Sequence, residues 1–460
     1  MNVSYSDQRV TIIGMAREGT ALARFFAQAG ARVTVSDLRG VADLADEIGQ
    51  LAGLPIQAVL RGHPDDILEA DVMYVSPGVP REVPIVRKAQ ERGVTLSSET
   101  ELIFALCPAP IIGITGSSGK TTTTTLIGEM MKMDRRRKIW VGGNIGIPLI
   151  ESVTEMKSRD WVVLELSSFQ LEHLTRSPHV AVVTNLRPNH LDRHPSYDAY
   201  KAAKANILRY QSADDVAVLN WDDLEVRAMA TQCAARIRWF SIEEPLENGV
   251  FLDGDWIVVH HDESPERVLR LGDLALRGRH NVANVLAALS VVTATGLKVE
   301  TAARVAKQFS GAPYRLELVR EIDGVRWIND SIATSPDRTL AALNAFGDEP
   351  IILLAGGRDK HLPMEEMAEA IVHRVRHLIT FGEAATLIEQ AVKQAQSRLN
   401  GNGRTVPVSH CDTMEAAVAV AKQLAQRGDT VLLSPSGTSF DAFKDFAARG
   451  DRFNELVAAL

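Results

Sequence analysis

The stretch "GITGSSGKTTTTTL" at residues 113–126 constrains the fold most, because it sets a glycine-rich turn between an apolar strand and a helix. Backbone N–H groups in such a turn, together with the N-terminus of the following helix, bind phosphate. The usual nucleotide loop, G-x-x-x-x-G-K-[ST], needs glycine at position 114, where this chain has isoleucine. The order of strand, Gly-Lys-Thr and helix still favours a nucleotide loop over an ordinary turn capped by serine and threonine. We expect Lys120 to reach the β- and γ-phosphates and Thr121 to offer its hydroxyl to Mg²⁺.

The same succession of strand, glycine turn and helix recurs along the 460 residues. Apolar strands such as "ARVTVSD", "WVVLE" and "DTVLLSPSG" end in polar turns, which predicts an α/β fold with parallel sheets covered by helices. We predict a Rossmann-like domain over 1–107, a central P-loop-type ATPase domain with a mainly parallel sheet over 108–312, and a C-terminal Rossmann-like domain over 313–460. Ligands of such sheets bind beyond the carboxyl ends of the strands.

Composition and net charge argue against two classes of binding partner, nucleic acids and membranes. A net charge of −8 argues against a general nucleic-acid or membrane surface, and the basic run "DRRRK" at 134–138 is typical of a solvated helix end. No apolar run approaches the ~20 residues of a membrane helix, and the start of the chain lacks the features of a secretory signal. Cys107, Cys233 and Cys411 have no metal or redox spacing. We therefore expect a cytoplasmic protein that binds neither nucleic acid nor membrane.

Three further side chains are candidates for a metal site. Glu165 ends an apolar strand, where an Mg²⁺ ligand is favoured over a carboxylate that merely faces solvent. His190 follows another strand, and on its own it is equally a turn residue or a ligand. Lys201 and Lys204 lie three residues apart on a predicted helix, and their spacing alone indicates a solvated face.

Motifs along the whole chain carry a family resemblance. They are "TGSSGKT", "GGNIG", "LELSSFQLE", "NHLDRH", "GRHNVANVLAAL", "NDSIATSP", "LLAGGRDK" and "LLSPSGTSFDAFKDFAARGDRF". The chain resembles the Mur ligases of peptidoglycan synthesis, which are related to folylpolyglutamate synthetase. The phosphate loop of that family is typically T-G-[TS]-x-G-K-[ST], which the sequence fits.

The resemblance implies ATP and Mg²⁺, with two ions, as cofactors of the central domain. Thr121 and Glu165 would ligate one ion, and His190 the second, together with Lys204 as a carbamate formed from CO₂. Asn281 and Asn284 would frame adenine, although helix capping is an alternative for Asn281. The implied ATP-binding residues are Gly116, Ser117, Ser118, Gly119, Lys120, Thr121, Thr122, Asn281, Asn284, Arg315 at the phosphates and Asp330 at the ribose.

The resemblance also implies the two other substrate sites. The residues implied for the UDP-linked substrate are Gly14, Arg17 and Glu18 at the diphosphate, Asp37, Arg39 and Gly78 at uracil and its surroundings, and Asn144 at the sugar or alanyl end. The residues implied for the incoming amino acid are Thr334, Lys360, Ser439 and Phe446.

The implied reaction joins D-glutamate to UDP-N-acetylmuramoyl-L-alanine through an acyl phosphate, with Lys120, His190, Lys204 and Arg315 as catalytic residues of a monomer. The sequence departs from the family at Ile332, where lysine is frequent, at Asn189, where an acidic residue is usual, and at Ser117–Ser118, which replace Thr-Asn. Ile332 borders the amino-acid pocket, so a ligase that adds L-glutamate or lysine is an alternative.

More distant alternatives are an unrelated P-loop ATPase and a nicotinamide oxidoreductase. The sequence lacks the G-x-G-x-x-G motif that the oxidoreductase would need.

Overall fold

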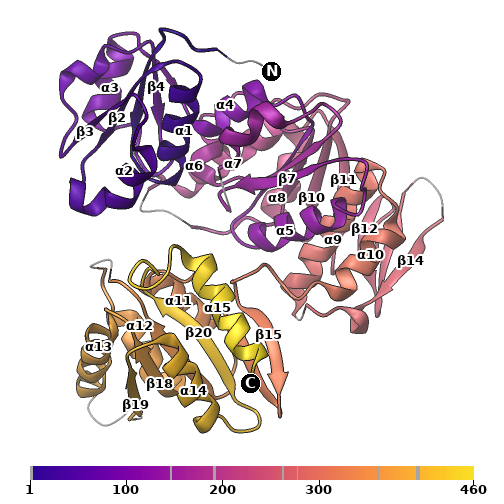
Figure 1. Cartoon of the computed structure of the whole chain (residues 1–460). Helices are drawn as coiled ribbons and strands as arrows, with labels where there is room; N and C mark the ends of the chain where they lie inside the picture. Colours follow the sequence, from indigo (N-terminus) through magenta and orange to yellow (C-terminus); the bar gives the residue numbers. More distant parts are fainter. Residues whose placement is uncertain are drawn as a thin grey trace. The chain divides into compact units, whose positions relative to one another are not determined.

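The structure is a computed structural model that describes residues 4–145, 148–189, 193–261, 264–276, 278–359, 362–399 and 405–460. Three separate sheets flanked by helices confirm the predicted three-part α/β fold (Figure 1). The chain divides into two compact units, 1–309 and 310–460. The first unit holds two of the sheets, and the second unit holds the third. The domain boundaries at 107–108 and 312–313 stay predictions.

The first sheet is parallel, with the strand order β3-β2-β1-β4-β5 expected of a Rossmann-like domain. Its strands are β1 (Arg9–Ile13), β2 (Arg32–Asp37), β3 (Ile56–Leu60), β4 (Val72–Val75) and β5 (Thr95–Ser97), and its helices are α1 (Arg17–Gln28), α2 (Ala45–Leu51) and α3 (Pro84–Glu91). The chain order reverses between β1 and β4, so a crevice for ligands is expected at the carboxyl ends of these two strands.

The second sheet has the order β14-β13-β12-β11-β10-β9-β6-β8-β7. It is parallel from β7 to β12 and antiparallel beyond, which confirms a mainly parallel sheet. Its strands are β6 (Ile111–Thr115), β7 (Ile139–Gly143), β8 (Trp161–Glu165), β9 (Val180–Val183), β10 (Val216–Asn220), β11 (Arg236–Ser241), β12 (Gly249–Asp253), β13 (Trp256–His260) and β14 (Glu266–Arg270). Its helices are α5 (Lys120–Met131), α6 (Ser168–Leu171), α7 (Tyr197–Arg209), α8 (Leu224–Met229), α9 (Arg279–Thr295) and α10 (Val299–Gln308).

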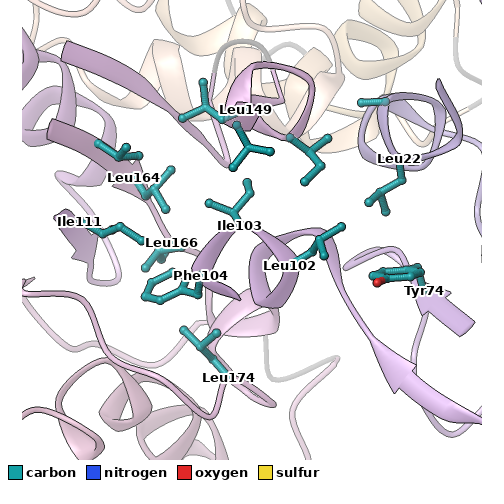
Figure 2. Packing of buried hydrophobic residues seen from close by; sticks show 14 of the residues in the cluster. Leu22, Tyr74, Leu102, Ile103, Phe104, Ile111, Leu149, Leu164, Leu166 and Leu174 are labelled. Atoms are coloured by element: carbon teal, nitrogen blue, oxygen red, sulfur yellow. The ribbon is translucent and has the colours of Figure 1, made fainter. Parts of the chain in front are cut away.

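Helix α4 (Glu99–Leu106) joins these two sheets through a common core. Figure 2 shows Leu102 on the side of Leu22 and Tyr74 of the first sheet's layer, and Ile103 and Phe104 among leucines that belong to the second. Those leucines are Leu149, Leu164, Leu166 and Leu174. One apolar cluster therefore includes residues of both sheets, which share a core within residues 1–309.

The third sheet has the order β15-β16-β20-β17-β18-β19 and is parallel except for the β15–β16 hairpin. Its strands are β15 (Glu317–Ile322), β16 (Val325–Asn329), β17 (Ile351–Gly356), β18 (Val375–Phe381), β19 (Val408–Cys411) and β20 (Thr430–Ser436). Its helices are α11 (Pro336–Asn344), α12 (Glu365–Arg374), α13 (Ala385–Arg398), α14 (Met414–Leu424) and α15 (Phe446–Ala458). The last strand along the chain, β20, lies between β16 and β17 and is parallel to both, so the three carboxyl ends meet at one edge.

Candidate active site

The predicted nucleotide loop lies between β6 and the N-terminus of α5. Gly116 and Gly119 have φ values of +151° and +79°, which side chains with a Cβ rarely adopt. A Cβ on Gly116 would come within 1.9 Å of Thr184 Oγ1, and one on Gly119 within 2.4 Å of Asn284 Oδ1. Glycine is therefore required at both positions, because the loop backbone passes directly against the side chains of Thr184 and Asn284.

The turn after β9 braces this loop. The Ser118 backbone N–H donates to Asn185 Oδ1 at 3.0 Å, and Thr184 Oγ1 donates to the Ser118 carbonyl at 2.7 Å. Ser117 Oγ lies 2.9 Å from the hydroxyl of Tyr200 on α7. Sequence reasoning missed Tyr200, which is buried on the same helix as Lys204.

The two predicted Mg²⁺ ligands of the loop region contact each other. Thr121 Oγ1, on the first turn of α5, donates to Glu165 Oε2 at 2.7 Å, and Asn144 Nδ2 donates to Glu165 Oε1 at 2.9 Å. Glu165 is 2% exposed, at the end of β8 beside β6. The Lys120 ammonium group donates to the Gly116 carbonyl at 3.0 Å. A carboxylate, a hydroxyl and an ammonium group thus converge on the loop.

Lys204 is 1% exposed, and its amine points at the start of the loop. Its Nζ donates to Thr115 Oγ1 at 3.0 Å and to the Gly116 carbonyl at 2.9 Å. Burial holds the pKa of Lys204 well below its usual range, and the nearby charge of Lys120 lowers it further, against an opposing effect of Glu165. The expectation of a solvated face from spacing alone was wrong for this residue.

Asn281 and Asn284 lie together on α9, beside the start of α5. Asn284 Nδ2 donates to Asn281 Oδ1 at 3.2 Å, and Thr123 Oγ1 donates to Asn284 Oδ1 at 3.3 Å. The N-cap of α9 is Gly278, so the capping alternative for Asn281 is wrong. The two asparagine side chains therefore form a hydrogen-bonded polar pair next to the predicted nucleotide loop.

A pocket of about 400 Å³ opens between the first and second sheets. It is lined by residues that follow β4, including Ser76 and Arg81, and by Phe169, Gln170 and Arg193 of the second sheet's layer. Arg193 Nη2 donates to the Gly78 carbonyl at 3.3 Å. Sequence reasoning missed Arg81 and Arg193, which bring positive charge to a pocket near the predicted Gly14 and Gly78.

Glu18 lines this pocket but is paired with another buried acid. Gln170 Nε2 donates to Glu18 Oε1 at 3.2 Å, and Glu18 also shares a side-chain hydrogen bond with Glu99. Burial raises the pKa of Glu18 to about 7, and burial together with the charge of Glu18 raises that of Glu99 to about 8. The pair therefore holds a proton near neutral pH.

Other predicted residues of the first unit are already engaged by protein groups. Arg39 makes a bidentate contact with Asp37, with Nε–Oδ1 and Nη2–Oδ2 distances of 3.0 and 2.9 Å. Burial by itself would raise the pKa of Asp37, but the Arg39 side chain and the Met15 N–H lower it to about 2. Arg17 Nη2 donates to the Gly143 carbonyl at 3.3 Å, next to Asn144.

The second unit gathers predicted residues at the carboxyl ends of β16 and β20. Burial raises the pKa of Asp330 to about 7, and Ser434 Oγ donates to its Oδ2 at 2.9 Å. Ser331 Oγ donates to the Phe446 carbonyl at 2.8 Å, and Ser439 is buried in the turn after β20. The Thr334 N–H donates to the Ile332 carbonyl at 2.9 Å.

Two predicted residues, His190 and Lys360, lie outside the described residues. Within the described ranges, no group of three or more His, Cys, Asp and Glu side chains is placed to hold a metal ion. The metal site expected from the sequence depends on Thr121, His190 and a modified Lys204 besides Glu165, so it stays a prediction.

Known proteins match this chain along its length. The Mur ligase MurD-like N-terminal domain matches residues 8–98, the Mur ligase middle domain matches 114–292, and the Mur ligase glutamate ligase domain matches 314–437. The UDP-N-acetylmuramoylalanine–D-glutamate ligase of Acetivibrio thermocellus is 42% identical over 455 residues, which cover 99% of this chain and 97% of that relative. This chain belongs to the Mur ligase family. A ligase of the same name from Symbiobacterium thermophilum is 41% identical and covers 98% of each chain.

Solved structures place this Mur ligase in the same fold. The crystal structure of the UDP-N-acetylmuramate-alanine ligase MurC from Thermotoga maritima matches with a TM-score of 0.54 at 17% identity, over 98% of this chain and 99% of that one. MurF from Acinetobacter baumannii matches with a TM-score of 0.53 at 16% identity, over 98% and 93% of the two chains.

No helix in the described part of this Mur ligase is long and apolar enough to cross a bilayer.

Proposed function

We propose that this Mur ligase is an ATP-dependent enzyme that joins D-glutamate to UDP-N-acetylmuramoyl-L-alanine, in the cytoplasmic synthesis of peptidoglycan precursors. The observation that carries the proposal is the convergence of Glu165, Thr121 and the buried Lys204 amine on a glycine-lined nucleotide loop. Relatives about 40% identical over nearly the whole chain carry the name of this ligase, which supports the choice of substrates. The predicted domain boundaries assign residues 1–107 to the UDP-linked substrate, 108–312 to ATP and 313–460 to the amino acid.

The proposed chemistry solves the problem of a poor leaving group. Transfer of the γ-phosphoryl group of ATP to the alanyl carboxylate releases ADP and gives an acyl phosphate. The ammonium group of glutamate first loses one proton to solvent, and the neutral amine attacks the acyl carbon. The nitrogen loses a second proton as the C–O bond to phosphate breaks, which leaves the amide and inorganic phosphate. Lys120 neutralises phosphate charge beside the loop, and Arg315 is proposed for the same task. The protein therefore contributes alignment and charge compensation rather than a nucleophile.

The residues around the loop fit Mg²⁺. A hard cation prefers oxygen ligands, and Glu165 and Thr121 supply a carboxylate and a hydroxyl that already touch. When bound, the ion would neutralise phosphate charge and orient the transferred group. We propose two such sites, the second held by His190 and a carbamate on Lys204. A lowered pKa increases the fraction of the Lys204 amine that is neutral, and the neutral amine is the form that adds CO₂. Lys204 is therefore suited to that modification.

The pocket between the first two sheets fits the UDP-linked substrate. Its volume of about 400 Å³ lies in the range of small-molecule sites. Arg193 could offer positive charge to a diphosphate, whereas Arg81 is paired with Glu101, and Glu82 and Glu172 also line the pocket. We propose that Gly14, Arg17 and Gly78 contact the diphosphate side of this substrate, whereas Asp37 and Arg39 would serve the base from the end of β2. Glu18 is the weakest member of the predicted set, because a carboxyl group shared with Glu99 offers little to an anion.

The choice of amino acid is tested by phosphate release. With ATP and Mg²⁺ present, release should require UDP-N-acetylmuramoyl-L-alanine and D-glutamate together. L-Glutamate and L-lysine offered in the same assay test the alternative that Ile332 leaves open. Release at the full rate without the UDP-linked substrate or without an amino acid would overturn the ligase proposal in favour of an ATPase.

A further inference from the structure

A fully buried arginine lies against the loops of the second unit that carry the residues predicted for the amino acid. Arg449, on α15, is 0% exposed, and no ion pair to it is found among the described residues. Burial lowers its pKa to about 10, against the opposing charge of Asp441. Burying a guanidinium group without a paired carboxylate costs free energy, and hydrogen bonds from its N–H groups must offset that cost.

The Arg449 guanidinium group makes four hydrogen bonds, all to the loops at the edge of the third sheet. Nε donates to Ser331 Oγ at 3.1 Å and Nη2 donates to the Ser331 carbonyl at 3.0 Å. Nη2 also donates to the Gly437 carbonyl, and Nη1 to the Thr438 carbonyl, each at 3.1 Å. One planar group thus ties the segment after β16 to the segment after β20.

The segment after β17 is tied to the same point. A Cβ on Gly357 would come within 2.8 Å of Arg449 Nη1, so the backbone at Gly357 passes directly against the guanidinium group. The next residue, Arg358, donates its N–H to the Thr438 carbonyl at 2.8 Å, the same oxygen that accepts from Arg449. The segments that follow β16, β20 and β17 therefore all meet at Arg449.

These segments carry the residues predicted for the amino acid. Thr334 lies three residues after Ser331, and Ser439 directly follows Thr438. Phe446 lies one helical turn before Arg449, and its carbonyl accepts from Ser331 Oγ. The guanidinium group faces backbone and one hydroxyl, so it acts on these residues through the loops that hold them.

We propose that Arg449 is a positioning residue of the glutamate pocket, which fixes the loops at Ser331, Gly357 and Gly437–Thr438 relative to one another without touching the substrate. The inference rests on the proposed function, because it takes the second unit as the site of the amino acid. A lysine cannot replace the fork, since one ammonium group cannot reach three carbonyls and a hydroxyl in these directions.

The test compares Arg449→Lys with Arg452→Lys on the same helix. Arg452 is an exposed partner of Glu415 and Glu455 and serves as the matched control. Arg449→Lys should raise the KM for D-glutamate about tenfold or more while the KM for ATP and for the UDP-linked substrate stays close to wild type. Arg452→Lys should leave all three KM values near wild type.

Ser331→Ala provides a second variant, which removes only the hydroxyl between Arg449 and Phe446 and is expected to fold. It should also raise the KM for D-glutamate selectively. An unchanged KM for D-glutamate in Arg449→Lys, or in Ser331→Ala where the lysine variant does not fold, would overturn this inference alone. An equal rise of all three KM values would overturn it too, since that result indicates a general structural role. A wild-type enzyme whose turnover does not depend on D-glutamate would overturn the proposed function with it.

Discussion

Lys204 Nζ donates a hydrogen bond to the carbonyl of Gly116, the first glycine of the TGSSGKT loop, at 2.9 Å. A buried amine with a lowered pKa therefore lies where the predicted phosphate loop begins, close enough to Glu165 for that carboxylate to oppose the lowering. This relationship links helix α7 to the nucleotide site and makes Lys204 part of the site rather than of the surface.

Removal of the loop amine should abolish turnover. In Lys120→Ala the phosphate groups lose the ammonium group that neutralises them, and we expect kcat to fall about 100-fold or more. Lys132→Ala, at the other end of α5, removes an exposed lysine paired with Glu129 and should leave kcat unchanged. Phosphate release at saturating substrates measures both variants. Near-normal turnover in Lys120→Ala would show that the loop is only structural.

The carbamate predicted on Lys204 can be tested by chemical rescue. Lys204→Ala should lose most activity, and short-chain carboxylates such as formate or acetate should restore part of it by occupying the space of the missing carbamate. Lys201→Ala, on the same helix, removes ion pairs to Asp198 and Glu225 and should show neither the loss nor the rescue. Loss without any rescue would leave Lys204 with a role as an amine only.

Glu165→Gln should weaken the binding of Mg²⁺. The glutamine keeps the shape of the side chain but lacks the negative charge, so we expect the Mg²⁺ concentration for half-maximal activity to rise about 10- to 100-fold. Glu155→Gln, which alters an exposed partner of Lys138, is the control. A magnesium titration of phosphate release gives both values, and equal values in the two variants would contradict the assignment of Glu165 as a ligand.

The Glu18–Glu99 pair predicts how stability depends on pH. Burial raises both pKa values above the 4.5 of a free glutamate, to about 7 and about 8, so the folded state retains a proton that the unfolded state releases. The stabilising effect is complete below about pH 4.5 and is lost as the pH rises toward 8.

Glu99→Gln should therefore unfold at the same denaturant concentration as wild type near pH 4.5, and should be the more stable of the two at pH 8 by about 1–3 kcal/mol. Glu91→Gln, on the exposed face of α3, should show no such trend. Urea denaturation across this pH range measures the difference. A stability gap that stays constant with pH would mean that the pair is ionised throughout.

Local patterns in the sequence were sufficient to predict the parallel sheets and the glycine-rich loop, because the signals for strands, turns and helices are short-range. Lys204 and Arg449 needed more. Each occupies a position in the buried stripe of its helix, with Tyr200, Ala203 and Ile207 around the one and Phe453 and Val457 around the other. The available signal in each case was a charged residue in an apolar helical stripe. The family resemblance implied a role for Lys204 but none for Arg449.

Contacts between distant segments were not accessible from the sequence. Glu18 and Glu99 meet only because α1 and α4 pack together, and nothing near either residue indicates an acidic partner. The same holds for Asn144, whose amide donates to Glu165 across neighbouring strands β7 and β8. Arg81 and Arg193 come to one pocket from different sheets, so neither stood out as a binding residue.

Helix α4 has a consequence for how this enzyme can be divided. Its buried side chains Leu102, Ile103 and Phe104 complete apolar layers on both sides of the predicted boundary at 107–108. A fragment ending at residue 107 would leave Ile103 and Phe104 in water, at about 1.5–3 kcal/mol for each one exposed. Residues 1–309, which form one compact unit, are thus the N-terminal piece expected to be expressed as a folded protein, and residues 1–107 are not expected to fold apart from it.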